Sequence, residues 1–469
     1  AVAAAGVSPA WVALSSGPTL RASSVRCLPA PGRPASRRLV PRYAAPPLDD
    51  SKVAVLLSRN ARGVTERLIG WAEGACGADN VFATNSLEEA REAGAAIVEA
   101  GYGTVISGGG DGTLAAALTA VRDARRDRWG EPVPLAGMPR FAVLPLGTGN
   151  AMARFIWPRG AGGLELLPPC DDASSPGAGS SSSGRHAPRS AWPRPWLWPG
   201  VVWRFVRGRG DETALQRAIN LVMRAGAAAG RPGVTGRGTL DRVIRVPVLE
   251  SDTNDLCFMA GCGFDAFLLD DFQALKKLVK RTPLKRPLSS VLGYFVAMLV
   301  FTLPRYITGR HSLRVRVSVP VGSPVFYVDP RRGDAALALA QAAEGSLTLY
   351  EGPASIVAAG TCPFLGGGMQ LFPFARSAEG MMHLRIANLS PLRFVPNVMK
   401  IFRGTYRNTL AAFDFVCRAC SVEIIGEHKA PFQQSGDAMG RRRGFKLHIA
   451  GSVRFLDFVG LPDPLRHLS

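Results

Sequence analysis

The chain has 469 residues, of which 47% are hydrophobic, and a formal net charge of +20, so it is long and apolar enough to form two packed domains. This composition excludes wholesale disorder. Its eight cysteines are scattered, which argues against a dense disulfide framework and favours a reducing compartment. Cys417 and Cys420 have metal-ligand spacing, but no second pair of ligands has a matching spacing. A zinc or redox site is therefore not expected.

Most of the excess positive charge lies in residues 1–48 and 154–245, outside the regularly patterned regions. The remaining basic residues form no recognition helix or helix-turn-helix pattern. Aromatic residues are not interleaved with them as on a base-stacking platform. We therefore expect no nucleic-acid partner.

Residues 1–49 are predicted to be a leader. The first 48 residues are rich in Ala, Ser, Pro and Arg and contain no Asp, Glu or Lys, a composition typical of an organellar transit peptide. This indicates a plastid or a mitochondrion. The alternative is a plain disordered extension, in which case we expect a cytoplasmic protein at a membrane surface.

Residues 50–158 alternate short apolar runs with helical stretches, which predicts a parallel sheet with covering helices. Ser86-Leu-Glu-Glu89 is a capping box at the start of the second predicted helix. The predicted strands are 52–57, 81–84, 104–107 and 141–144, and the predicted helices are 65–76, 86–100 and 113–124. This region is predicted to be an α/β domain.

Residues 159–245 interrupt this pattern with serine, proline and tryptophan and are predicted to be a low-complexity insertion with one helix near 213–228. The Trp192–Trp203 segment would suit a membrane interface or an ordinary packed insertion. Residues 246–460 are strand-rich and predict a second, mainly antiparallel β domain, followed by a tail at 461–469. The alternation of Leu313, Val315, Val317 and Val319 places them on one face of a strand, and Phe445, Leu447 and Ile449 repeat that pattern.

The most apolar run is Val291–Leu303. It is shorter than the roughly 20 residues that a helix needs to cross a bilayer. Basic residues flank it, so it would suit docking on an anionic membrane surface. A buried helix is the simpler interpretation, and we favour it. The flanking basic residues are Lys276, Lys277, Lys280, Arg281, Lys285, Arg286, Arg305 and Arg310.

Two glycine-rich loops carry the chemistry, and each follows a predicted strand and precedes a helix. In Ser107-Gly-Gly-Gly-Asp-Gly-Thr113 the glycines let the backbone approach a polyanion, and the amides of the following helix favour phosphate. Asp111 in that loop would hold Mg²⁺ or accept a proton, as phosphoryl transfer requires, unless it merely caps a turn. The second loop is Pro145-Leu-Gly-Thr-Gly-Asn150. Both loops lie at the carboxyl edge of the predicted sheet, where ligands bind in open α/β sheets.

No Walker A loop occurs in the sequence, which excludes the ordinary P-loop mode of nucleotide binding. The six histidines have no metal-ligand or triad spacing, and a G-x-S-x-G elbow is absent, so lipid hydrolysis is disfavoured.

The two loops together resemble the diacylglycerol kinase and sphingosine kinase superfamily of lipid kinases. Ala260-Gly-Cys-Gly-Phe-Asp-Ala266, Gly366-Gly-Gly-Met369 and Gln434-Ser-Gly-Asp437 are similar to pieces of that family's second domain. The resemblance covers about residues 52–158 and 246–458. It implies a phosphofructokinase-like α/β nucleotide domain, a C-terminal β-sandwich domain, and ATP with Mg²⁺ in the cleft between them.

The resemblance also assigns site residues. It maps the catalytic aspartate onto Asp111, as general base or as the group that orients the lipid hydroxyl. The family's Asp-Gly-Glu motif corresponds to Ser435-Gly436-Asp437, which leaves Asp437 as a metal or nucleotide ligand. The family's Asn-Pro after the first strand is Ser58-Arg59 here, so Asn60 is its expected substitute. The other nucleotide contacts are expected from Gly109, Gly110, Gly112, Thr113, Gly147, Thr148, Gly149 and Asn150.

Asp265 lies in a glycine-rich turn at the start of the second domain, where it would bind the lipid head group or simply cap the turn. The expected function is an ATP-dependent lipid kinase that acts on diacylglycerol and binds anionic membranes peripherally. The alternatives are a sphingoid-base or ceramide kinase, a small-molecule kinase such as an NAD kinase, and a non-catalytic lipid-binding relative. The sequence carries no signal for the oligomeric state.

Overall fold

The structure is a computed structural model in which all described residues belong to one unit, Pro47–Ser469. The leader, nearly all of the insertion with its predicted helix, the tail and Thr148 lie outside the described residues. The description covers residues 48–156 and 243–456 except for 62, 130–133, 148, 285–287, 289–290, 310–312, 330–335, 339–344, 366–367 and 407–410.

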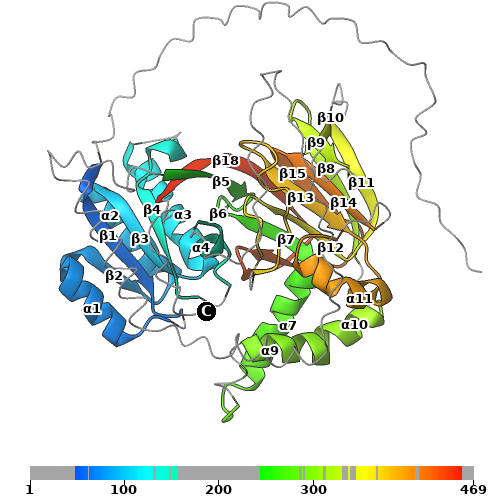
Figure 1. Cartoon of the computed structure of the whole chain (residues 1–469), viewed down its shortest axis with the longest axis horizontal. Coiled ribbons are helices and arrows are strands. Elements are labelled where there is room, and N and C mark those ends of the chain that lie inside the picture. Colours follow the sequence, from blue (N-terminus) through cyan, green and yellow to red (C-terminus); the bar gives the residue numbers. More distant parts are fainter. Residues whose placement is uncertain are drawn as a thin grey trace, which may run out of the picture. The chain divides into compact units, whose positions relative to one another are not determined.

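Four parallel strands form one end of a ten-stranded sheet, in the order β4-β3-β1-β2 (Figure 1). All four predicted strands are confirmed, with ends that differ by a few residues. They are β1 (Asp49–Ser58), β2 (Val81–Thr84), β3 (Tyr102–Gly109) and β4 (Arg140–Pro145). Strand β3 is buried along its whole length, as expected of a strand covered on both faces.

The helices of this part are α1 (Glu66–Cys76), α2 (Leu87–Glu99), α3 (Asp111–Trp129) and α4 (Ala151–Ile156). The Ser86 hydroxyl caps α2 by accepting a hydrogen bond from the Glu89 amide at 3.1 Å. The reciprocal half of the predicted capping box differs, because the Glu89 carboxylate accepts its bond from the amide of Asn85 at 2.6 Å instead of that of Ser86. The helix therefore begins as predicted, with the bond displaced by one residue.

The C-terminal region is β-rich, and its strand pairs are antiparallel. Strands that extend the ten-stranded sheet are β5 (Val243–Ser251), β6 (Leu256–Cys257), β8 (Leu313–Pro320), β11 (Ser346–Ala354), β15 (Ala419–Ile424) and β18 (Gly444–Leu456). An eight-stranded sheet contains β7 (Met259–Gly263), β9 (Val325–Val328), β10 (Ala336–Ala338), β12 (Ile356–Gly360), β13 (Met382–Ala387), β14 (Ala412–Cys417), β16 (Ala430–Gln434) and β17 (Asp437–Arg442). Side chains of both sheets form one apolar core.

The alternation predicted for β8 is confirmed. Val315, Val317 and Val319 are buried in the core between the sheets, whereas Arg314 and Arg316 are exposed. A strand with one face on a core and one face in solvent requires this two-residue period.

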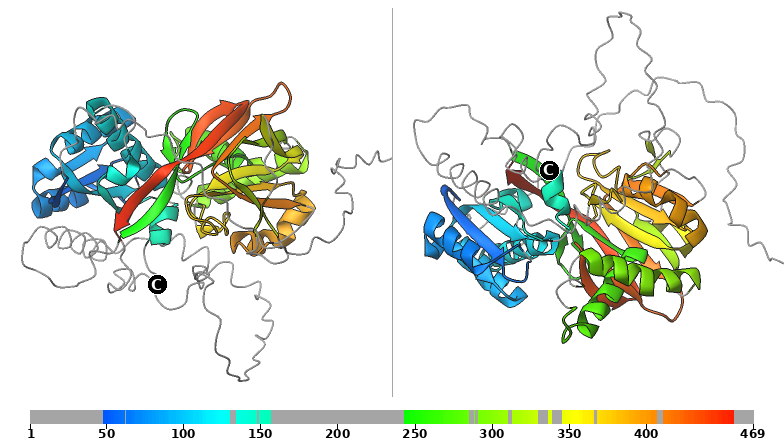
Figure 2. Two further views of the ribbon diagram at one scale, coloured as in Figure 1. Left: turned by 90° about the horizontal axis from the view of Figure 1, so that it is seen from above. Right: turned by 60° about the horizontal axis from the view of Figure 1, so that its bottom comes forward.

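Strand β18 joins the two parts of the chain (Figure 2, left). Its beginning pairs with β15, most of its length pairs with β5, and Phe455 near its end pairs in parallel with Phe141 of β4. At 13 residues and about 3.3 Å per residue, it is long enough to reach from one part to the other. The α/β and β-rich regions therefore share one continuous sheet, which the sequence did not predict.

A group of helices accompanies the β-rich region: α7 (Phe264–Leu278), α9 (Val291–Ala297), the π-helical turn Met298–Thr302, α10 (Leu303–Ile307) and α11 (Pro391–Phe402). The favoured interpretation of Val291–Leu303 as a buried helix is wrong, because Leu299 and Val300 are each 58% exposed. Ala297 and Thr302, on one side of this segment, are buried. Leu299 and Val300, on the other side, are not covered by the described residues. No described helix has the length and apolar character needed to cross a membrane.

Candidate functional site

The two glycine-rich loops meet at the carboxyl edge of the parallel strands. The carbonyl oxygen of Gly109, at the end of β3, accepts hydrogen bonds from the amides of Leu146 at 3.1 Å and Gly147 at 2.9 Å. These bonds join the loop after β3 to the loop after β4. The predicted convergence of the two motifs is thus a direct backbone contact.

Glycine is required at this contact because the two backbones nearly touch. A methyl group built on Gly147 would lie 2.3 Å from the Cα atom of Gly110, closer than any real side chain approaches. On the other side of the loop, a methyl group on Gly109 would lie 2.4 Å from Oγ1 of Thr113. The Thr113 side chain therefore packs on its own loop.

Asp111 begins α3, and its carboxylate fixes the start of α4. Oδ2 accepts a hydrogen bond from the Ala151 amide and Oδ1 one from the Met152 amide, both at 2.9 Å. The residue is only 8% exposed, and burial raises the pKa of Asp111 although these amide bonds partly oppose the shift. Each oxygen thus has an internal partner, and the Ala151 and Met152 amides at the start of α4 are engaged by Asp111.

Asn150 closes the second loop on itself. Its backbone has a φ of 50°, and its side chain accepts from the Gly147 amide at 3.0 Å and donates to the Gly147 carbonyl at 2.7 Å. A weaker bond reaches the carbonyl of Pro145 at 3.3 Å. The side chain that the sequence assigns to the nucleotide therefore shapes the turn. Gly149 is partly exposed next to it.

Asn60 lies beyond the end of β1, at the same edge of the sheet. It is exposed, and its side-chain amide donates to the carbonyl of Asn85, just after β2, at 2.6 Å. The structure thus places Asn60 near the ends of the strands, with its donor engaged by the neighbouring loop.

Asp437 approaches the first glycine loop from the β-rich region. It is solvent-exposed at the start of β17, and a methyl group built on Gly112 would lie 1.8 Å from its Oδ2 atom. The pKa of Asp437 is raised, first because neighbouring protein displaces its hydration and next because of the negative charge of Asp111, while Lys276 opposes the shift. The structure therefore brings together two of the three carboxylates that the sequence singled out: Asp111 is buried, and Asp437 is accessible.

The turn that presents Asp437 is built without the acid that the family has at its first position. Ser435 is buried with a φ of 49°, its amide donates to the Met259 carbonyl at 2.8 Å, and its hydroxyl accepts from the Phe258 amide at 3.2 Å. The serine is thus a structural member of the turn and offers no charge to a ligand.

Gln433 connects Asp265 to this turn and was missed by the sequence analysis. Its Nε2 donates to Oδ2 of Asp265 at 3.1 Å, and its Oε1 accepts from the Gly436 amide at 3.1 Å. The second oxygen of Asp265, Oδ1, is buried without a hydrogen-bond partner in the described part of the chain. Burial raises the pKa of Asp265 to about 6, so this carboxyl takes up a proton as the pH falls through about 6.

Helices α7 and α9 supply two further neighbours of Asp437 that the sequence analysis did not assign to the site. Lys276 is partly buried with its Nζ 5.1 Å from the centroid of the Phe272 ring, and that ring stacks on Tyr294 at 3.8 Å. Burial, followed by the charge of Asp437, raises the pKa of Tyr294 to about 12. Lys276 therefore lies near enough to Asp437 to act on its charge, and its predicted part in membrane docking stays a prediction.

The residues present fit a nucleoside triphosphate with a divalent cation. The first-turn amides of α3 follow Gly110, where a methyl group built on the glycine would lie 3.6 Å from the nearest atom, and Asp437 offers an accessible carboxylate beside Gly112. Mg²⁺ commonly takes one or two carboxylates together with phosphate oxygens and water. The described residues contain no cluster of three metal-ligating side chains.

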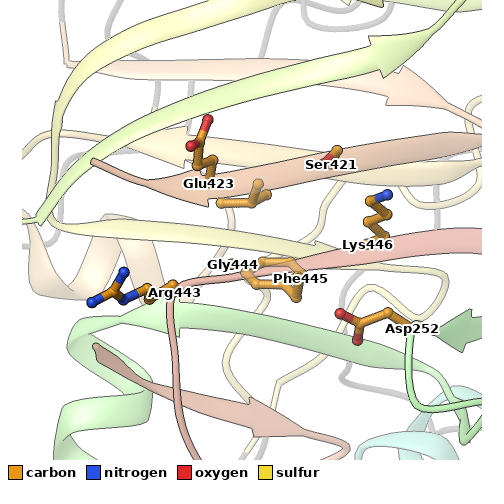
Figure 3. Close-up of a pocket in the computed structure, with 8 residues that line it drawn as sticks. Asp252, Ser421, Glu423, Arg443, Gly444, Phe445 and Lys446 are labelled. Carbon is orange, nitrogen blue, oxygen red and sulfur yellow. The ribbon is translucent and has the colours of Figure 1, made fainter. Parts of the chain in front are cut away.

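Two other features lie apart from the loops. A hollow of about 270 Å³ on β15 and β18 is lined by charged residues that include Asp252, Arg443 and Lys446 and by the apolar Val422 and Phe445. No glycine-loop residue lines it (Figure 3). Cys417 and Cys420 are free thiols in the core, and burial raises the pKa of each well above its usual range, as expected of packing residues.

Comparison with known proteins places this geometry in context. Residues 61–168 match the family model of the diacylglycerol kinase catalytic domain, a segment that includes both glycine loops and Asp111. A search of curated proteins found no match. Two crystal structures from Bacillus anthracis str. Sterne were found as structural neighbours: a protein proposed to be a diacylglycerol kinase, 12% identical over 88% of this chain and 99% of that chain with a TM-score of 0.47, and a diacylglycerol kinase, 10% identical over 88% and 98% with a TM-score of 0.44. The family match confirms the resemblance seen in the motifs.

Proposed function

We propose that this chain, which carries a diacylglycerol kinase catalytic domain over residues 61–168, transfers the γ-phosphoryl group of ATP to the hydroxyl of a membrane lipid, with diacylglycerol as the acceptor. The observation that carries the proposal is the meeting of the two glycine loops with Asp437. It supplies in one place a backbone cradle for phosphates and an accessible carboxylate, which are the parts that phosphoryl transfer needs.

The nucleotide would lie over the glycine loops, with its phosphates along Gly110 and the first turn of α3. Amide hydrogens and the positive end of the helix dipole stabilise negative charge there. The contact between Gly110 and Gly147 keeps the loops fixed before the nucleotide arrives. Catalysis of this kind depends on positioning and charge stabilisation.

Asp437 is the residue that would hold a divalent cation, and such a cation, when bound, neutralises charge on the phosphates. Lys276 lies close enough to influence the pKa of Asp437 and would contribute a second positive charge beside the phosphates. Both residues come from the β-rich region. The site is therefore completed by parts of the chain on both sides of the insertion.

Asp111 supports this site in two ways. Its hydrogen bonds to α4 hold the second loop against the first, and its negative charge raises the pKa of Asp437. The assignment of Asp111 as general base stays a prediction, to be tested beside Asp437, whose carboxylate is more accessible to a lipid hydroxyl.

The test is transfer of labelled γ-phosphate from ATP to a panel of lipids in mixed micelles, with the products identified by mass spectrometry. Phosphatidic acid formed from diacylglycerol supports the proposal, whereas preferential labelling of a sphingoid base or ceramide would replace the acceptor. Labelling of a soluble metabolite alone would indicate a small-molecule kinase. ATP binding without transfer to any acceptor would indicate a non-catalytic relative. This alternative is considered because Ser435 stands where the family's motif has an acid.

A further inference from the structure

Exposed apolar side chains gather on one group of helices. Of the 13 large hydrophobic residues that are exposed in the described chain, ten lie between residues 278 and 307 or on α11. We call these ten residues the docking face: Leu278, Leu284, Leu292, Phe295, Leu299, Val300, Ile307, Leu392, Met399 and Phe402. The largest exposures are 88% for Leu392 and 72% for Leu278. Such a concentration marks an interaction surface, whereas single exposed apolar residues do not.

The two stretches that form the docking face are connected in the fold. Helices α10 and α11 are in contact, and the Phe394 ring of α11 packs on Tyr306 of α10 and on Phe264 of α7. Thr302 donates to Asp271 of α7 at 2.8 Å, and Arg305 pairs with the same carboxylate. The apolar side chains are therefore presented by an anchored scaffold.

The docking face lies in two stretches of the chain whose charged residues are all basic. Residues 272–310 contain eight Lys or Arg and no Asp or Glu, and residues 388–413 contain four Lys or Arg and no Asp or Glu. Arg305 is engaged by Asp271, and Lys276 lies near enough to Asp437 to act on its charge. The exposed cations beside the apolar residues are Lys277, Lys280, Arg281, Arg393, Lys400 and Arg403.

We propose that the docking face binds the surface of an anionic lipid bilayer, with its apolar side chains inserted at the headgroup boundary and its cations on the lipid headgroups. Helices that bind at a membrane interface combine an exposed apolar face, which enters the headgroup region, with positive charge beside it. A second copy of this chain is a poor occupant, because pairing would place two purely basic surfaces against each other. That the bilayer also delivers the acceptor rests on the proposed function, since α7 and α9 carry both this face and the neighbours of Asp437.

The test is co-sedimentation of the full chain with vesicles of neutral phosphatidylcholine and with vesicles that also contain phosphatidylserine. The parent is expected to sediment with the anionic vesicles and to be released by salt. Changing Lys277, Lys280, Arg393 and Lys400 together to Gln should weaken binding on the order of 10³-fold at low salt, since each cation contributes about 1 kcal/mol. A matched control changes Arg91, Arg418, Lys429 and Arg443, exposed basic residues elsewhere, to Gln. Equal losses in both variants, or none in the first, would overturn the proposal.

A second pair of variants tests the apolar side chains. Leu299→Gln with Leu392→Gln should reduce sedimentation with anionic vesicles, whereas Leu87→Gln with Val321→Gln, which are exposed elsewhere, should not. Sedimentation velocity without lipid separates a bilayer from a protein partner. Concentration-dependent self-association that the Leu299 and Leu392 changes abolish would assign the face to a protein interface and reject the bilayer.

Phosphotransfer to a dispersed short-chain lipid distinguishes failure of this inference from failure of the proposed function. The docking-face variants are expected to retain the parent's rate on that acceptor and its unfolding temperature, while losing rate on vesicles. Vesicle binding by a parent that phosphorylates no lipid would leave the docking face standing and reject the kinase proposal. Normal turnover by the variants on anionic vesicles would reject the docking face as the route to the substrate.

Discussion

The glycine loops and the docking face differ in what holds their side chains. At the loops, backbone packs on backbone, and the side chains of Asp111 and Asn150 find hydrogen-bond partners inside the protein. On the docking face, Leu299 and Leu392 have anchored helices beneath them and no cover among the described residues. One region is complete before a ligand arrives, and the other is completed by its partner. A change in the loops should therefore alter turnover on every acceptor, while a change on the face should matter at a membrane.

The largest effect is expected from Asp437→Asn. If this carboxylate positions the phosphates and their cation, its loss should slow phosphotransfer about 10² to 10⁴-fold, equally on vesicles and on a dispersed short-chain lipid. The measurement is kcat on both acceptors. Asp111→Asn is the companion variant, because an amide in its place cannot accept from both Ala151 and Met152 and should also lower stability by about 1 to 3 kcal/mol. A selective loss on vesicles alone would remove Asp437 from the site.

Gly147→Ala tests how tightly the loops are joined. The new methyl group would meet the backbone of Gly110, which has no flexible end to move aside, so the free energy of unfolding should fall by about 1 to 3 kcal/mol. Gly110→Ala is the control, since its methyl group would lie 3.6 Å from the nearest atom. Chemical denaturation of both variants measures the difference. Equal stability would contradict the close packing of the two loops.

The buried carboxyl of Asp265 predicts a pH dependence of stability. Its pKa is raised to about 6 in the folded state against 3.8 when unperturbed, so the folded state binds the proton more readily. This contribution makes the protein more stable as pH falls from about 6 to about 4. Asp265→Asn should remove that slope and raise the free energy of unfolding by about 3 kcal/mol near neutral pH. Thermal unfolding of the parent and the variant, measured across this pH range, tests the prediction. A variant whose pH dependence equals the parent's would contradict the burial of this charge.

The smallest effect is expected from Leu392→Gln. Because this side chain is 88% exposed, its replacement should change the free energy of unfolding by less than about 0.5 kcal/mol. The same denaturation experiment measures it, with Leu389→Gln, a buried neighbour, as the destabilised reference. A large loss of stability in Leu392→Gln would mean that other parts of the chain cover the docking face.

The sequence predicted the parallel strands, their helices and the meeting of the two loops, because those features follow from local patterns. An unbroken apolar run marks a strand covered on both faces, and glycine marks a close backbone approach. It did not predict the roles of Gln433 and Lys276. These residues reach the site through the pairing of β16 with β7 and the direction of α7, which no local spacing reveals.

The sequence also did not predict the exposure of Val291–Leu303. An apolar run has the same composition whether both of its sides are buried or one is left open, so hydrophobicity alone does not separate the two cases. The part that Asn150 plays in shaping its own turn was not predicted for a related reason, and its assignment to the nucleotide stays a prediction. An asparagine in a glycine-rich loop suits either a ligand or its own turn, and its left-handed backbone, at a φ of 50°, becomes visible only in the fold.

Strand β18 has a consequence for the order of folding. Phe455 pairs with Phe141, so part of the sheet that carries the glycine loops closes only after more than 300 further residues have been synthesised. Pairings of such long range form slowly, and until then the free side of β4 is an open strand edge able to pair with other chains. The nascent protein should therefore spend much of its synthesis with its first domain unfinished, and a chaperone that shields strand edges should raise the yield of active protein.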